Sequence, residues 1–202
     1  MINRREFNFG SVLALSTLLP PLPSLVQASE IGEDGLHVQD WFLQSFLEIG
    51  EDQQEMSGQN KHLAVLFEQK GCPYCKQMHE VNLANDKIVN YIKQHFGVLQ
   101  INMWGSKGVT DLDGDEMEEK DLARKWRVNF TPTIVFLRQG DLDGMPLNTA
   151  QAARMPGYLK PFHFLTMFEF VAEKHYENQG FQQYLKEKIV KLKAEGKDPD
   201  LL

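Results

Sequence analysis

Short apolar runs alternate with amphipathic stretches along this chain. The runs Leu63 to Phe67, Phe96 to Trp104 and Pro132 to Phe136 are short and either β-prone or alternating in polarity, which predicts strands. Apolar residues at helical spacing predict helices over residues 76–83, 85–92, 118–126, 161–175 and 181–192. Glycine-containing turns at residues 105–119 and 140–144 separate neighbouring elements.

The segment at residues 29–60, before the first strand, is interpreted as an extension. Between Leu36 and Met56 five apolar residues lie at helical spacing, which predicts a helix. These residues are Trp41, Phe42, Phe46, Leu47 and Ile49. A helix packed on the domain is favoured over one that contacts substrate. Residues 57–60 predict the turn into the strand.

The first 28 residues have the layout of an export signal. Arg4 and Arg5 precede a largely apolar stretch at residues 10–19, and small residues up to Ala28 fit a cleavage site. The stretch is too short to span a bilayer, which needs about 20 residues. Residues 4–7 resemble a twin-arginine signal; general secretion and an uncleaved anchor are alternatives. We therefore expect an exported, periplasmic protein that is cleaved after about Ala28.

The composition is that of a soluble globular protein. A chain of 202 residues is long enough for one domain with a sizeable core. The formal net charge of −7 argues against nucleic acid as a partner. An exported protein with two cysteines would meet an oxidising compartment, where a disulfide persists unless something reduces it.

Cys72 and Cys75 form a C-x-x-C motif between the strand that begins at Leu63 and a predicted helix. Pro73 would occupy the first turn of that helix, where its missing N–H is not needed. The unpaired N–H groups and the positive end of the helix dipole favour a thiolate at Cys72. Cys75, one turn later, lies close enough to attack a mixed disulfide at Cys72. We assign Cys72 as the nucleophile and Cys75 as the resolving thiol.

Structural roles for the two cysteines are weaker interpretations. A closed zinc site needs four ligands, and the six histidines lack metal-ligand spacing. A purely structural disulfide would close a loop of four residues, which gives little stabilisation. The acidic residues from Asp111 to Asp115 suggest calcium, but Glu116 and Leu122 stand where an EF-hand needs Gly and Glu. That stretch is interpreted as a solvated turn, and no metal or cofactor is expected.

Glu68 is the candidate proton carrier of the site. It follows Leu66 on the same face of the predicted strand and precedes Cys72 by four residues. A carboxylate at this place would relay a proton to or from Cys75 during disulfide exchange. A strand-end glutamate exposed to water is an equal alternative.

A strand, a C-x-x-C motif that opens a helix, and a later Thr131-Pro132 before an apolar strand together resemble the thioredoxin superfamily. The resemblance runs from about Leu63 to His175 and implies an α/β fold with a central mixed sheet flanked by helices. Residues 61–194 would form this domain, with an extra C-terminal helix and a tail at 195–202. In the family the proline is cis and faces the cysteines. Thr131 and Pro132, together with Pro73 and Tyr74, are therefore assigned to substrate binding.

Three segments are most similar to periplasmic thioredoxins of the SoxW type. They are Gly71 to Cys75, Leu122 to Trp126, and Gly157 to Leu159 with the phenylalanine-rich helix after it. Thioredoxins carry a buried aspartate six residues before the first cysteine, where this chain has Leu66. The Pro-Tyr dipeptide is also similar to glutaredoxins, but their Gly-Gly signature is missing.

The expected function is a monomeric periplasmic thiol–disulfide oxidoreductase that reduces disulfides of exported proteins. The resemblance implies a membrane thiol-electron carrier of the DsbD or CcdA kind as its reductant. A disulfide oxidase or isomerase is an alternative, because the sequence does not fix the reduction potential. A Cu(I) carrier is an alternative from another class, since two thiolates suit Cu(I).

Overall fold

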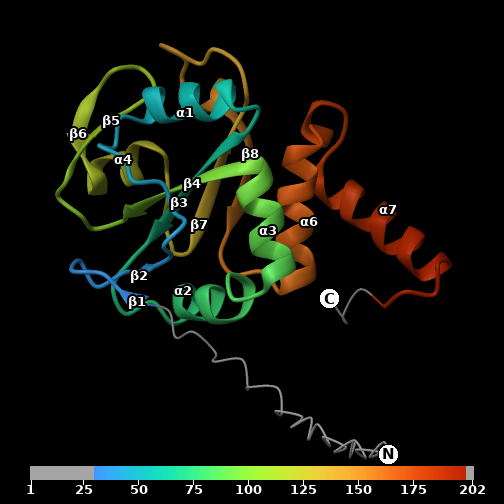
Figure 1. The fold of residues 1–202 in the computed structure, drawn as a ribbon. Coiled ribbons are helices and arrows are strands. Elements are labelled where there is room, and N and C mark those ends of the chain that lie inside the picture. The colour runs from blue at the N-terminus through green and yellow to red at the C-terminus, as the bar shows by residue number, and fades with distance from the viewer. Residues whose placement is uncertain (1–29, 199–202) are drawn as a thin grey trace, which may run out of the picture.

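A four-stranded sheet lies at the centre of the computed structural model, which describes residues 30–198 (Figure 1). The strand order is β4-β3-β7-β8, with β3 at His62–Glu68, β4 at Phe96–Asn102, β7 at Thr133–Leu137 and β8 at Gln151–Pro156. β3 pairs in parallel with β4 and antiparallel with β7, and β8 pairs antiparallel with β7. The sheet is therefore mixed, as expected.

The inner strands β3 and β7 are buried on both faces. Every residue of each strand is buried. Alternate side chains therefore enter two apolar clusters, with Val65 and Phe67 in one and Ala64 and Leu66 in the other. This two-sided burial explains why the apolar run of β3 in the sequence is continuous.

Helices cover both faces of the sheet (Figure 1). On the face of Val65 lie α1 (Ile49–Gly58) and α4 (Glu119–Lys125), which contribute Met56 and Leu122 to the cluster. On the face of Leu66 lie α3 (Asp86–His95), α6 (Pro161–Ala172), and α2 (Pro73–Gln77) with the π-helical turn η1 (Met78–Asn82). The arrangement agrees with the thioredoxin fold that the sequence predicts.

Smaller elements complete the domain. A hairpin of β5 (Gly108–Thr110) and β6 (Glu116–Glu118) occupies the stretch expected to be a turn, and a short helix, α5 (Leu147–Ala150), precedes β8. After α6, the 3-10 turn η2 (His175–Glu177) leads to α7 (Phe181–Ala194).

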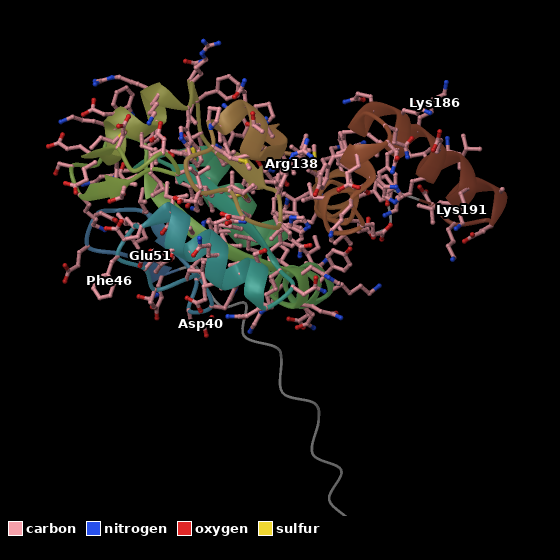
Figure 2. The ribbon with its side chains drawn as sticks, turned by 90° about the horizontal axis from the view of Figure 1, so that it is seen from above. Asp40, Phe46, Glu51, Arg138, Lys186 and Lys191 are labelled. Carbon is pink, nitrogen blue, oxygen red and sulfur yellow. A yellow bond between two sulfur atoms is a disulfide. The ribbon has the colours of Figure 1, made fainter. Side chains whose placement is uncertain are left out.

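Helix α7 is the extra C-terminal helix. Its beginning packs on α6, where the ring of Phe170 lies 5.6 Å from that of Phe181 and 5.5 Å from that of Tyr184. The second half extends away from the domain (Figure 1). Figure 2 shows Lys186 and Lys191 on this projecting helix. Only the beginning of α7 therefore contributes to the core.

The helix expected over Leu36–Met56 is wrong in its first half. Residues 30–38 form a small hairpin, β1 (Glu30–Ile31) with β2 (His37–Val38), and α1 begins only at Ile49. Between them the chain follows the edge strand β4, where the Leu43 amide donates to the Val98 carbonyl. A helix cannot pass through Leu47, whose φ is 66°. The apolar pattern instead reflects contacts of an extended chain, and Phe46 points to solvent (Figure 2).

The expected export signal at residues 1–28 lies outside the described residues, as does the end of the tail at 199–202. Within residues 30–198, no helix is both long and apolar enough to cross a membrane.

Candidate functional site

The cysteine pair lies where β3 gives way to α2. β3 ends at Glu68, Gly71 takes a φ of 74° that favours glycine, and Cys72 is the N-cap of α2. Pro73 is the first residue of the helix, as predicted. Cys72 and Cys75 form a disulfide with 5.2 Å between their Cα atoms. The chain is therefore described in its oxidised form.

Two donors point at the sulfur of Cys72. The backbone N–H of Cys75 lies 3.1 Å from it, and the hydroxyl of Thr131 lies 3.3 Å from it. The carbonyl oxygen of Thr131 is 3.6 Å away. Both donors would bind a thiolate after reduction, and hydrogen bonds to a charged form favour that form. The geometry therefore supports Cys72 as the attacking sulfur.

Thr131 and Pro132 face the cysteines from the start of β7. The peptide bond between them is cis. The Pro132 carbonyl accepts a hydrogen bond from the N–H of Gly157, at 2.7 Å, at the end of β8. This bond fixes the segment against the sheet. The Thr131 carbonyl is directed at Cys72 and has no backbone partner within the described part of the chain.

Three exposed aromatic residues lie in segments that adjoin Cys72 or its hydrogen-bond partners; we call them the aromatic rim, and they are Tyr74, Trp104 and Phe130. Their exposed fractions are 59%, 63% and 55%. Tyr74 lies between the cysteines, and Phe130 directly precedes Thr131. Trp104 follows β4, and its indole N–H donates to the side-chain oxygen of Gln69. The backbone carbonyl of Gln69 in turn accepts from the Cys72 amide. The rim therefore comes from the first turn of α2 and from two separate loops.

Glu119 holds the loop that carries Trp104. Its carboxylate is buried and accepts the backbone N–H of Asn102 at 2.9 Å and that of Lys107 at 3.3 Å. A Cβ at Gly105 would lie 1.9 Å from this carboxylate, so only glycine fits there. One buried side chain thus fixes both ends of the loop.

Behind the cysteines, Glu68 forms a buried pair with His79. The Glu68 side chain is buried, so its alternative as a solvent-exposed strand end is wrong. Its Oε2 lies 3.1 Å from Nε2 of His79, in η1, and 2.5 Å from the amide nitrogen of Gln100, in β4. Among the residues that the structure describes, its Oε1 has no hydrogen-bond partner. The pair occupies the sheet face that α2 and η1 cover.

The N-terminal segment closes over this pair. The amide nitrogen of Gln39 lies 3.1 Å from Nδ1 of His79, and the carbonyl of His37 accepts from Gln100 at 2.6 Å. The rings of His37 and His79 lie 5.4 Å apart. Residues 37–39 therefore belong to the surroundings of the site, although no sequence pattern predicted this role.

The structure brings all seven sequence-predicted site residues into one region. Cys72 and Cys75 form the disulfide, and four others adjoin it in the chain or in space: Pro73, Tyr74, Thr131 and Pro132. Glu68 lies behind it. Sequence reasoning missed His79, Gln39, Gln100 and Trp104. Only His79 carried a usable signal, because it follows Cys75 by four residues and so shares its helix face.

The acidic turn from Asp111 to Asp115 is more ordered than the sequence suggested. Asp111 is buried and accepts from the indole N–H of Trp126 at 3.1 Å. The ammonium group of Lys125 lies 2.9 Å from Asp111, 2.6 Å from Asp113 and 2.9 Å from Asp115. The hydrogen bond from Lys125 lowers the pKa of Asp113. A cationic side chain thus occupies the centre of the carboxylates. Over residues 30–198, no cluster of three or more His, Cys, Asp or Glu is placed to bind a metal ion.

Comparison with known proteins places the chain in a family. A family model described as a thioredoxin-like domain matches residues 49–172, a region that begins at the first residue of α1. Helix α1, which the sequence assigned to the extension, therefore falls inside the matched region. No curated protein matches the chain.

Solved structures also match. A thioredoxin-fold protein from Helicobacter pylori is 27% identical, with a TM-score of 0.48, over 65% of this chain and 81% of that one. A thioredoxin from Thermus thermophilus is 24% identical, with a TM-score of 0.47, over 63% and 85%. The DsbD C-terminal domain of Neisseria meningitidis, in its oxidised form, is 13% identical, with a TM-score of 0.39, over 58% and 90%. Because the family model spans more than half of the sequence, the chain belongs to the thioredoxin-like domain family.

Proposed function

We propose that the protein is an exported thiol–disulfide oxidoreductase that reduces disulfides of other exported proteins. The observation that carries this proposal is the position of Cys72. Its sulfur caps a helix, accepts from the Cys75 amide and the Thr131 hydroxyl, and faces the Thr131–Pro132 segment. A structural disulfide needs none of these contacts.

The reaction proceeds in two exchange steps. In the reduced protein, the Cys72 thiolate attacks one sulfur of a substrate disulfide, forms a mixed disulfide and releases one substrate thiolate. Cys75 then loses its proton and attacks Cys72, which releases the second substrate thiolate and closes the Cys72–Cys75 disulfide. Two electrons pass to the substrate, and its two thiolates take up two protons. We assign Glu68 to accept the proton of Cys75.

The Thr131 carbonyl and the aromatic rim indicate how a protein substrate is held. An extended substrate segment would donate a backbone N–H to this carbonyl, next to the sulfur under attack. Exposed aromatic side chains provide large apolar contact area. We infer that the substrate is a polypeptide with apolar residues near its disulfide.

The location, the subfamily and the reductant form part of the same proposal. The export signal at residues 1–28 supports a periplasmic location, and three sequence segments support a protein of the SoxW type. A reductase in an oxidising compartment needs electrons, and a membrane carrier of the DsbD or CcdA kind is the proposed source. Fractionation of cells that express the chain with Arg4 and Arg5 replaced by Lys tests the export route.

Insulin reduction tests the activity. The reduced wild-type protein is expected to accelerate precipitation of the insulin B chain in the presence of dithiothreitol. The Cys72→Ser variant is expected to have no activity, whereas Cys75→Ser is expected to accumulate the mixed disulfide. Equal activity of Cys72→Ser and wild type would dispose of the proposal.

The reduction potential tests the direction of electron flow. Related proteins range from about −270 mV for thioredoxin to about −120 mV for DsbA. A value near −270 mV, measured in glutathione or dithiothreitol redox buffers, is expected. A value near −120 mV would instead identify an oxidase.

A further inference from the structure

Buried polar side chains lie behind the disulfide. Cys75 and His79 are both buried and lie four residues apart across α2 and η1, so their side chains share the helix face that covers the sheet. Glu68 meets His79 from β3 on that face. His79 is thus a neighbour of the resolving cysteine along the helix and a direct partner of the buried carboxylate.

The hydrogen bonds of the pair define where a proton can go. The amide nitrogen of Gln39 faces Nδ1 of His79, so Nδ1 accepts and Nε2 carries the hydrogen that is donated to Glu68. Both hydrogen bonds of the Glu68 side chain reach Oε2, and Oε1 is buried without a hydrogen-bond partner within residues 30–198. Oε1 is therefore the open position for a proton.

We propose that Glu68 and His79 act together as the buried base for the thiol of Cys75, and that Gln39 positions this base from the N-terminal segment. The inference rests on the proposed function and deepens it. It adds His79 to the proton path and makes residues 37–39 part of the reaction site. The segment before α1 is then a functional part of the protein.

The proton balance of the second exchange step follows from this arrangement. The Cys75 thiol gives its proton to the Glu68–His79 pair, and its sulfur attacks Cys72 in the mixed disulfide. The Cys72–substrate bond breaks as the Cys72–Cys75 bond forms. The substrate thiolate that leaves takes up one proton from solvent, and the pair passes the Cys75 proton to solvent and so returns to its starting state.

A pocket behind the pair provides the connection to solvent. Its volume is about 520 Å³, and it lies between the N-terminal segment and β4. Gln39 and Gln100 line it, and these are the two side chains whose amides bond His79 and Glu68. Solvent in the pocket is therefore one side chain away from the base.

Other titratable groups also act on this region. His37 lies against His79, and its pKa is lowered by burial and by the charge of His79. Lys76 in α2 and Glu80 in η1 interact electrostatically with His37 and form an ion pair with each other. Because several groups titrate near the pair, the pH profile of the resolution rate has to be compared between matched variants and not assigned to one histidine.

Single-turnover oxidation by glutathione disulfide tests the proposal. Rapid acid quench and mass spectrometry follow formation of the Cys72–glutathione mixed disulfide and its resolution by Cys75. In Glu68→Gln and His79→Gln, which keep polar side chains but cannot take the proton, resolution is expected to slow about 10²-fold. The mixed disulfide then accumulates, and the resolution rate rises steeply with pH as solvent base takes over.

Two matched variants separate proton transfer from structural effects. His62 is also buried on β3, but at the end far from Glu68, and His62→Gln is expected to resolve at the wild-type rate. Gln39→Glu gives Nδ1 an acceptor and favours the protonated pair, so the pH midpoint of resolution is expected to rise. Gln54→Glu adds the same charge at an exposed position of α1, outside the lining of the pocket, and should leave the midpoint unchanged.

The outcomes distinguish this inference from the proposed function. If wild-type Cys72 forms no mixed disulfide, the proposed function fails. If it does, and Glu68→Gln and His79→Gln resolve with wild-type rates and pH profiles, only the inference of a Glu68–His79 base fails.

A measurement on the wild-type protein tests the proposal even if the variants do not fold. Nitrogen-15 NMR of the His79 ring is expected to show the Nε2–H tautomer in the oxidised protein. The chemical shift of its Nε2–H proton should differ between oxidised and reduced protein at one pH, because the Cys75 thiol couples to the pair only after reduction. An identical shift in both states would overturn the proposal.

Discussion

The hydroxyl of Thr131 lies 3.3 Å from the sulfur of Cys72, although 59 residues separate them in the chain. It acts with the Cys75 amide, so a thiolate at Cys72 would have one donor from its own helix and one from the start of β7. The helix donor is fixed by the backbone. The hydroxyl is the donor that a single substitution can remove without changing shape.

Thr131→Val is therefore expected to make the reduction potential more negative. The reduced protein loses one hydrogen bond to a charged sulfur, worth about 1.5–3 kcal/mol. Since about 1.4 kcal/mol corresponds to about 30 mV, the potential should fall by about 30–60 mV. The measurement is equilibration with dithiothreitol redox buffers, together with the rate of Cys72 alkylation at neutral pH, which should decrease.

Thr133→Val is the matched control for this prediction. The Thr133 hydroxyl donates to the Phe130 carbonyl at 2.8 Å, in the same segment but away from the sulfur. Its loss should lower the free energy of unfolding by about 1 kcal/mol and leave the potential unchanged. A potential that moves equally in both variants would show that the effect arises from the segment and not from the Thr131 hydroxyl.

The aromatic rim is expected to matter for protein substrates and not for small disulfides. Replacing Tyr74, Trp104 and Phe130 together by Ser removes apolar contact area and should raise KM for insulin about tenfold or more. The rate with glutathione disulfide should change little, because the sulfur and its donors stay in place.

Val190→Ser provides the control for the rim. Val190 is 61% exposed on α7, which lies away from α2 (Figure 1). Its replacement should affect neither substrate. Equal loss with insulin and glutathione disulfide in the rim variant would mean that the substitutions disturb the chemistry itself.

Local patterns in the sequence were sufficient for most of the fold. β3 is a continuous apolar run because both of its faces are buried, and α3 begins at Asp86 after the N-cap Asn85, whose side chain accepts from the Lys87 amide. Those signals depend on neighbours in the chain. The helix prediction for the N-terminal segment failed in its first half. There the apolar side chains contact β4 and the domain from an extended backbone, and their positions in the sequence happen to match helical spacing.

The residues of the candidate site divide in the same way, into those that local sequence predicts and those that only the fold brings together. Cys72, Cys75 and Pro73 were predictable because the motif and the helix start are local. The contact of Glu68 with His79 depends on how η1 packs on β3, and the contact of His79 with Gln39 spans 40 residues. A sequence without structure gives no register for such pairs. The exposed positions of Trp104 and Phe130 likewise depend on loops that only the fold brings together.

Glu119→Ala is expected to destabilise the protein and release the loop that carries Trp104. Two backbone N–H groups lose a charged acceptor, and each such bond is worth about 1.5–3 kcal/mol, so the free energy of unfolding should fall by about 3–6 kcal/mol. Urea denaturation measures this loss. Glu116→Ala, at an exposed position of β6, is the control and should change stability by less than about 0.5 kcal/mol. A Glu119→Ala protein as stable as this control would contradict the role assigned to the carboxylate.

The stability of the domain is expected to fall below about pH 6.5 through His62. This ring is buried; its Nδ1 contacts the Leu137 carbonyl, and its Nε2 has no hydrogen-bond partner in the described part of the chain. Burial lowers the pKa of His62, so below its ordinary value of 6.5 the unfolded chain takes up a proton that the folded chain refuses. The free energy of unfolding then decreases by up to about 1.4 kcal/mol per pH unit. Urea denaturation from pH 5 to 8 should show this slope in wild type and a shallower one in His62→Gln. Parallel curves would contradict it.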